Sequence, residues 1–198
     1  MALLQNLSGK IDKFTNIARG NASADKIESI KAVVSEADRA HQNEFYARGM
    51  ESSRHNPASH MDADKAYDIG AYAETMVEHL GAVRSEVRGA GILPAETALE
   101  VLQLYSDMSS AMNGVASRTH PDIYARAMEL SKVEFDGIEA KGISELVRRV
   151  DRHQLEAFAD GIGRLKMLDD NFEQSLIKTA NERFEAEKSA IHLEQFTQ

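Results

Sequence analysis

The stretch AYDIGAYAETMVEHLGAVRSEV, residues 66–87, places its apolar side chains at alternating steps of three and four. This is the period of one face of an α-helix, whereas a half-buried strand alternates every two residues. The repeated positions form the clearest apolar stripe in the chain: Ala66, Ile69, Ala73, Met76, Leu80, Val83 and Val87. The stretch therefore predicts an amphipathic helix that buries this face.

The same period recurs along the rest of the chain, and no segment alternates with period two over the length of a strand. A second clear stripe covers residues 98–115. Further stripes mark residues 4–18, 27–45, 124–138, 143–158 and 165–191, and the helix of the 27–45 stripe could run to about residue 52. We therefore predict an all-α fold over residues 1–198, in one domain that is an antiparallel bundle of about six or seven helices with a long C-terminal helix.

Glycine, serine and proline predict the helix boundaries. In RGNAS, residues 19–23, Gly20 can stop one helix and Ser23 can cap the next by accepting a backbone N–H. Gly161 and Gly163 are predicted to separate the last two helices. A final helix that ran unbroken over residues 164–196 would be about 50 Å long at 1.5 Å per residue, and would extend beyond shorter neighbours.

The chain of 198 residues contains no cysteine. Its length allows a substantial core without a disulfide or a structural metal. The absence of cysteine excludes disulfides and thiolate zinc sites, so any metal chemistry would use His, Asp or Glu. The sequence shows no secretory signal and no apolar run of about 20 residues that could cross a bilayer. These features predict a soluble, cytoplasmic protein without membrane insertion.

The formal net charge of −9 is concentrated in the middle of the chain. Residues 51–140 hold seven Lys and Arg against fifteen Asp and Glu, while the flanking segments are nearly balanced. An acidic surface repels phosphate backbones and anionic membranes, so nucleic acid is not an expected partner. An alternative is that the acidic middle imitates nucleic acid, which requires its carboxylates to form one continuous face.

The stretch RHNPASHMDAD, residues 54–64, has two interpretations. Its imidazoles and carboxylates, from His55, His60, Asp62 and Asp64, would suit zinc, manganese or iron. Alternatively, Asn56 and Pro57 make a turn, Ser59 caps the next helix, and the aspartates complement the helix dipole. The second interpretation explains more residues, and the histidine spacing matches no helical metal motif. We therefore predict a turn and helix start.

His41 is the polar residue that the periodic pattern places on a core face, between Ala37 and Phe45. It belongs to DRAHQNE, residues 38–44, where Asp38 and Glu44 lie three positions away on either side. Di-iron bundles need two Glu-x-x-His elements and two further inward carboxylates, which the chain does not supply. We predict a buried histidine with a structural role; the alternative is a metal ligand or an acid–base group.

Two features favour binding of a protein partner. Gly81, Ser85 and Gly89 recur every four residues, and such a stripe of small residues could admit another helix closely. The predicted long last helix could leave apolar surface for a second chain. The chain has no nucleophile elbow, phosphate-binding loop or H-E-x-x-H pair, so no catalytic residue can be named.

We therefore expect a non-catalytic interaction protein, namely an adaptor, an assembly component or an effector, without a cofactor. It would bind a partner or self-associate through its helical surface. The alternative is an enzyme or metal-binding bundle with a His–carboxylate site, centred on His41 or on the loop that contains His55 and His60.

The tail ANERFEAEKSAIHLEQFTQ, residues 180–198, carries Glu182, Glu185 and Glu187. It resembles the glutamate-rich export signals of some bacterial type IV secretion effectors. The resemblance implies delivery to another cell by a specialised secretion system. A solvated helix face explains the same residues equally well.

Replacing His55 and His60 together by Gln should leave the free energy of unfolding within about 0.5 kcal/mol of the parent, because neither side chain is predicted to cap or to pack. Ser59→Ala should cost roughly 1 kcal/mol through the lost N-cap bond. Thermal melts with and without added zinc measure both effects. Zinc-dependent melting that disappears in the double variant would establish a metal site instead.

Overall fold

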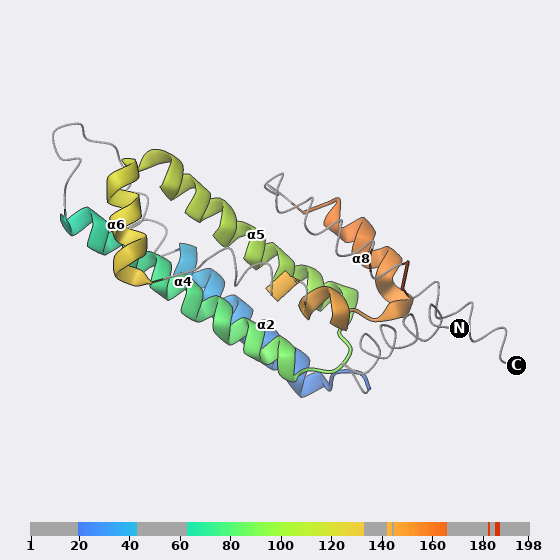
Figure 1. The fold of residues 1–198 in the computed structure, drawn as a ribbon. Helices are drawn as coiled ribbons and strands as arrows, with labels where there is room; N and C mark the ends of the chain where they lie inside the picture. Colours follow the sequence, from blue (N-terminus) through green and yellow to red (C-terminus); the bar gives the residue numbers. More distant parts are fainter. Residues whose placement is uncertain are drawn as a thin grey trace, which may run out of the picture.

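The computed structural model describes residues 20–42, 63–132, 142–143, 145–165, 182 and 185–186. Its named elements are the α-helices α2 (Ala24–Ala40), α4 (Ala63–Gly89), α5 (Ala95–Arg118), α6 (Pro121–Ser131) and α8 (Leu155–Ile162), with the 3-10 turn η3 (Arg152–Gln154). Residues 145–149 are also helical. The prediction of an all-α fold is confirmed: about six helices pack together (Figure 1).

α4 is the longest helix in the described part of the chain, with 27 residues. All seven positions of the predicted apolar stripe are buried, and Leu80 and Val83 are completely inaccessible. α2 and α6 both pack against α4, and Figure 1 shows α6 crossing its N-terminal end. The sequence period therefore identified the face of α4 around which its neighbours assemble.

α4 runs antiparallel to its two long neighbours, which makes α2 and α5 parallel to each other (Figure 1). Lys26 near the start of α2 pairs with Glu86 near the end of α4, with 2.5 Å between Nζ and Oε2. Lys31 of α2 in turn lies 3.8 Å from Glu100, which is near the start of α5. The predicted antiparallel arrangement therefore applies to α2 with α4 and to α4 with α5.

Three chain segments meet in parallel at one end of these helices. Ile92 lies beside Asn21, and Leu93 lies beside Val150, as isolated β-bridges. Ile92 N–H donates to Gly20 O, and its carbonyl accepts from Ala22 N–H, each over 2.9 Å. These backbone bonds fix the start of α2, the α4–α5 connection and residues 149–151 against one another. Together the three segments are called the junction below.

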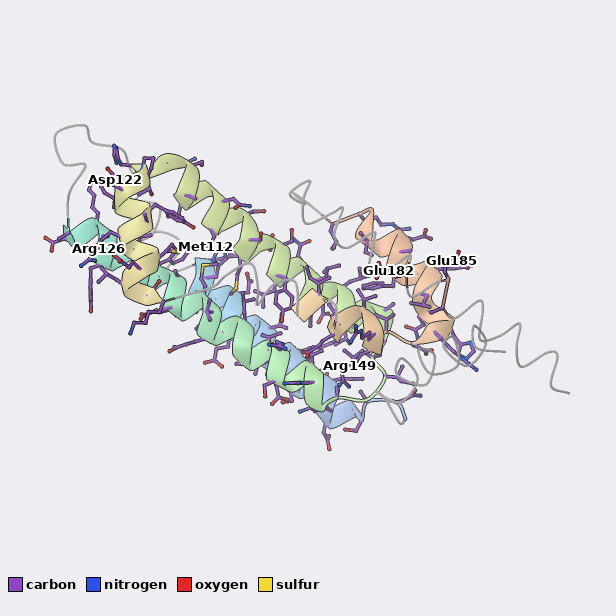
Figure 2. All side chains as sticks on the ribbon, in the orientation of Figure 1. Met112, Asp122, Arg126, Arg149, Glu182 and Glu185 are labelled. Atoms are coloured by element: carbon purple, nitrogen blue, oxygen red, sulfur yellow. The ribbon has the colours of Figure 1, made fainter. Side chains whose placement is uncertain are left out.

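Arg149 adds a side-chain bond to the junction. Its Nη1 donates to the carbonyl of Ala90, just after α4, while the Arg149 side chain is buried (Figure 2). A cation at the C-terminal end of a helix also opposes the negative end of the helix dipole. Within the described residues, Nε of Arg149 has no hydrogen-bond partner. Burial lowers the pKa of Arg149, against the attraction of Glu145.

The predicted start of α2 is confirmed. Gly20 has a φ of 95°, and the Ser23 side chain accepts from Lys26 N over 3.2 Å to cap α2. α5 begins after Pro94, with Gln154 Oε1 accepting from Ala95 N over 2.7 Å. The α5 cap therefore comes from a residue distant in sequence.

Two expected helix ends are wrong, and one predicted break is confirmed. The fifth helix was predicted to reach residue 138, but α6 ends at Ser131 because Lys132 adopts the left-handed conformation, with a φ of 54°. The sixth segment is broken at Val150 and Asp151, where the backbone joins the junction instead of continuing a helix. The predicted break near Gly161 and Gly163 is confirmed, because α8 ends at Ile162 and residues 163–164 form a turn.

Other expectations lie outside the described residues. These are the first helix over residues 4–18, the second helix beyond Gln42, and nearly all of the long C-terminal helix. In the tail, Glu182 and Glu185 are described; both are helical and exposed (Figure 2).

Gly91→Ala should destabilise the protein by roughly 1–3 kcal/mol, the usual cost of overpacking that shifts backbone. A Cβ at Gly91 would lie 2.2 Å from the Gly20 carbonyl oxygen, inside the junction. Gly81→Ala is the matched control, because it lies on an exposed helical site with no atom within 4 Å of the added Cβ. The control should gain about 0.5–1 kcal/mol from helix propensity. Urea unfolding of both variants tests this, and equal stabilities would contradict the described packing.

Candidate functional site

A groove of about 580 Å³ lies between α2 and α5 and is open to solvent. One wall is formed by α2 and the other by α5, while Leu165 closes it after α8. The lining residues are Lys31, Val34, Ser35, Asp38, Gln42, Glu96, Leu99, Glu100, Gln103, Leu104, Asp107 and Leu165. They follow the i, i+3, i+4 pattern of helix faces, so each wall is one strip of a helix.

The groove has an apolar floor. Val34 contributes to it from α2, Leu99 and Leu104 contribute from α5, and Leu165 contributes from the segment after α8. Leu104 is buried, whereas the other three are only partly buried and pack against the core. Partly exposed leucine and valine side chains keep apolar surface in contact with water, which another apolar group could cover favourably.

The groove walls are acidic. Four carboxylates line it, from Asp38, Glu96, Glu100 and Asp107, against the single cation of Lys31. Lys31 and Glu100 already form an ion pair, with 3.8 Å between Nζ and Oε1. In the part of the chain that the structure describes, the other three carboxylates have no ion pair. The groove therefore carries a surplus of negative charge over an apolar floor.

Two aspartates are held by amide side chains at one end of the groove. Gln42 Nε2 donates to Asp38 Oδ1 over 2.8 Å on α2, and Gln103 Nε2 donates to Asp107 Oδ1 over 2.7 Å on α5. Burial raises the pKa of Asp107, the Gln103 bond opposes this, and the negative charge of Asp38 raises it further. The two walls therefore present carboxylates that repel each other.

His41 lies behind this end of the groove and does not line it. It is only 6% exposed, as predicted from its stripe position. The Tyr72 hydroxyl lies 3.4 Å from Nδ1, and a neutral ring can accept its hydrogen there. Burial lowers the pKa of His41, against the attraction of Asp107 and Asp38. The surroundings therefore favour a neutral imidazole near neutral pH.

The candidate metal ligands His55, His60 and Asp62 lie outside the described residues, and so does Glu44. Among the residues that the structure describes, no group of three or more His, Asp or Glu could hold a metal ion. Asp64 is described at the start of α4, where it is exposed in the first turn.

The small-residue stripe is exposed. Gly81, Ser85 and Gly89 all lie on the outer surface of α4. No atom lies within 4 Å of a Cβ built on Gly81, and the nearest neighbour of Gly89 is the flexible end of Lys26. The stripe therefore does not mediate close helix packing in the described structure.

Sequence reasoning missed the groove because it depends on two helices that are distant in the chain. The stripe of α5 was predicted from Ala98, Val101 and Tyr105, but the neighbouring Leu99 and Leu104 form the floor. A signal was present, because α5 is apolar over more of its circumference than one packing face requires. The charges of Glu96, Glu100 and Asp107 gave no sign of facing α2.

No protein-family model, curated protein or solved structure matches this chain. In the described part of the chain, none of the helices has the length and apolar character needed to cross a membrane. The groove must therefore be interpreted from its own chemistry.

His41→Leu should remove part of the acid sensitivity of the fold. The lowered pKa of His41 means that its contribution to stability is complete above the unfolded value near 6.5 and is lost as pH falls toward the folded pKa. Urea unfolding of parent and variant between pH 8 and pH 5 measures the difference.

Tyr72→Phe is the matched control, because it removes the hydroxyl beside His41 but keeps the imidazole. It should lower stability at neutral pH and reduce the pH slope only in part, because the burial that lowers the pKa of His41 remains while the bond to its neutral ring is lost. If the free energy of unfolding of His41→Leu depends on pH as strongly as that of the parent, His41 is not a source of the acid sensitivity.

Proposed function

We propose that this protein is a non-catalytic binding protein that holds a segment of another protein in the groove between α2 and α5. The observation that carries the proposal is an open groove with a partly exposed apolar floor, from Val34, Leu99 and Leu165, between polar walls. Interfaces commonly combine an apolar centre with a polar rim. Covering the floor would remove apolar surface from water without requiring the core to rearrange.

The length of the groove suits a short polypeptide segment. Its lining extends over residues 31–42, in α2 and just after it, and over residues 96–107 of α5. Twelve helical residues extend about 17 Å at 1.5 Å per residue, which corresponds to roughly three turns of a bound helix. A segment of this length can place several anchor side chains on the floor.

The surroundings of His41 support binding over the alternative of catalysis at this histidine. An acid–base group must come within hydrogen-bond reach of a substrate. His41 is buried behind the groove and is not among its lining residues. The aspartates at this end are nearer to a bound molecule, but each already accepts a hydrogen bond from an amide.

Peptide display tests the proposal without assuming a partner. A phage library of random 16-residue peptides would be selected on the full-length protein, and each binding clone would then be measured against Ser35→Trp. Ser35 is exposed and lines the groove, so the indole should fill space that a peptide needs without removing core packing. Clones that bind the parent and not this variant are the expected result.

Ala32→Trp is the matched control, because Ala32 is an exposed position of the same helix that does not line the groove. It should retain the clones that Ser35→Trp loses. Selection that yields no clone sensitive to Ser35→Trp, with both variants folded by circular dichroism, would overturn the proposed function.

A further inference from the structure

We infer that the segment held in the groove is a basic amphipathic α-helix, with apolar side chains on the floor and a lysine or arginine between Asp38 and Asp107. This inference rests on the proposed function and deepens it by giving the chemical class of the partner. It combines the charge of the walls, the direction of the two helices and the position of the floor.

Charge complementarity selects a basic partner. The groove lining has three more carboxylates than cations, and its only lysine is already paired with Glu100. A cation at the Asp38 and Asp107 end would relieve the repulsion between these two carboxylates. Their amide neighbours hold one oxygen of each aspartate, so the carboxylates are positioned on opposite walls before a ligand arrives.

The walls favour a helix over an extended peptide. Residues 31–40 and 96–107 lie inside α2 and α5, whose interior backbone groups are bonded within each helix. An extended segment would find no free backbone edge to pair with, whereas a helix satisfies its own N–H and C=O groups. A third helix between two parallel ones also repeats the packing mode of helical bundles.

A second copy of the chain is a poorer occupant. The protein has a net charge of −9, and its acidic excess lies in the segment that includes α4 and α5. Bringing a second such surface onto the groove would place like charges together. The charge therefore favours a different, basic protein.

Two synthetic helical peptides test the inference directly. The first is a 14-residue peptide of leucine and lysine with the leucines in one stripe, and the second replaces every lysine by glutamate. Fluorescence anisotropy with the full chain should show binding of the lysine peptide, weakened by added salt. The glutamate peptide should bind at least about tenfold more weakly, because its charges repel the walls.

Charge variants locate the binding. The double variant Asp38→Asn, Asp107→Asn should lower the affinity for the lysine peptide by about tenfold. Glu74→Gln with Glu78→Gln is the matched control, because it removes the same charge from exposed positions of α4 outside the groove. This control should change the affinity by less than about twofold.

The pH dependence gives an independent measure. Asp107 is near Asp38 of α2, His41 just after α2 and Gln103 of its own helix, and burial raises its pKa above the usual range. The affinity for the lysine peptide should therefore fall as the pH falls through the pKa of Asp107, while the peptide keeps its charge. Asp107→Asn should remove that part of the pH dependence.

The outcomes separate the inference from the proposed function. Two results would overturn the basic helix and leave the proposed function standing. One is a set of displayed clones that depend on the groove but carry no basic residues. The other is equal affinity for both synthetic peptides. Binding of the lysine peptide that survives both Ser35→Trp and the aspartate double variant would place it elsewhere and overturn the inference. Sedimentation that shows a dimer disrupted by Ser35→Trp would identify a second copy as the occupant, which also overturns it.

Discussion

The junction of three parallel segments is the constraint on which the arrangement of the described helices depends. Leu93 donates its N–H to Arg149 O over 2.6 Å and accepts from Asp151 N–H over 2.8 Å, while Ile92 makes the equivalent pair with Gly20 and Ala22. The short α4–α5 connection is therefore bonded on both sides. Because α2 and α5 both leave from this point, their parallel direction and the groove between them follow from it.

Charged side chains of α4 strengthen the same arrangement. Glu86 accepts from Lys26 Nζ and from Ser29 Oγ of α2, and these bonds lower its pKa. On another side, Arg84 binds both oxygens of Glu145, which lowers the pKa of that carboxyl. Each charge-assisted contact joins α4 to one defined neighbour, because its geometry requires both side chains to be in place. They connect α4 to two segments that its apolar stripe alone would not distinguish.

Local pattern predicted the helices but not the groove. The stripes of α4 and α5 were readable because each buried face repeats every three or four residues, and the same pattern placed His41 in the core. The end of α6 was missed because Lys132 takes a left-handed conformation that its residue type does not favour. The break at Val150 was missed because an apolar residue suits a bridge as well as a helix. Predicting the groove requires knowing which helices are neighbours, and the junction determines this.

The parallel direction of α2 and α5 gives the groove a polarity. Peptide dipoles in both walls point the same way: Glu96 lies in the first turn of α5, at its positive end, and Asp38 lies in the last turn of α2, at its negative end. A helix lying between them experiences different fields in its two orientations. Running opposite to α2 and α5 would set its dipole against theirs and bring its positive N-terminal end toward Asp38 and Asp107. A bound helix would therefore be favoured in the antiparallel orientation, and a peptide with the same residues in reverse order would present them to the groove differently.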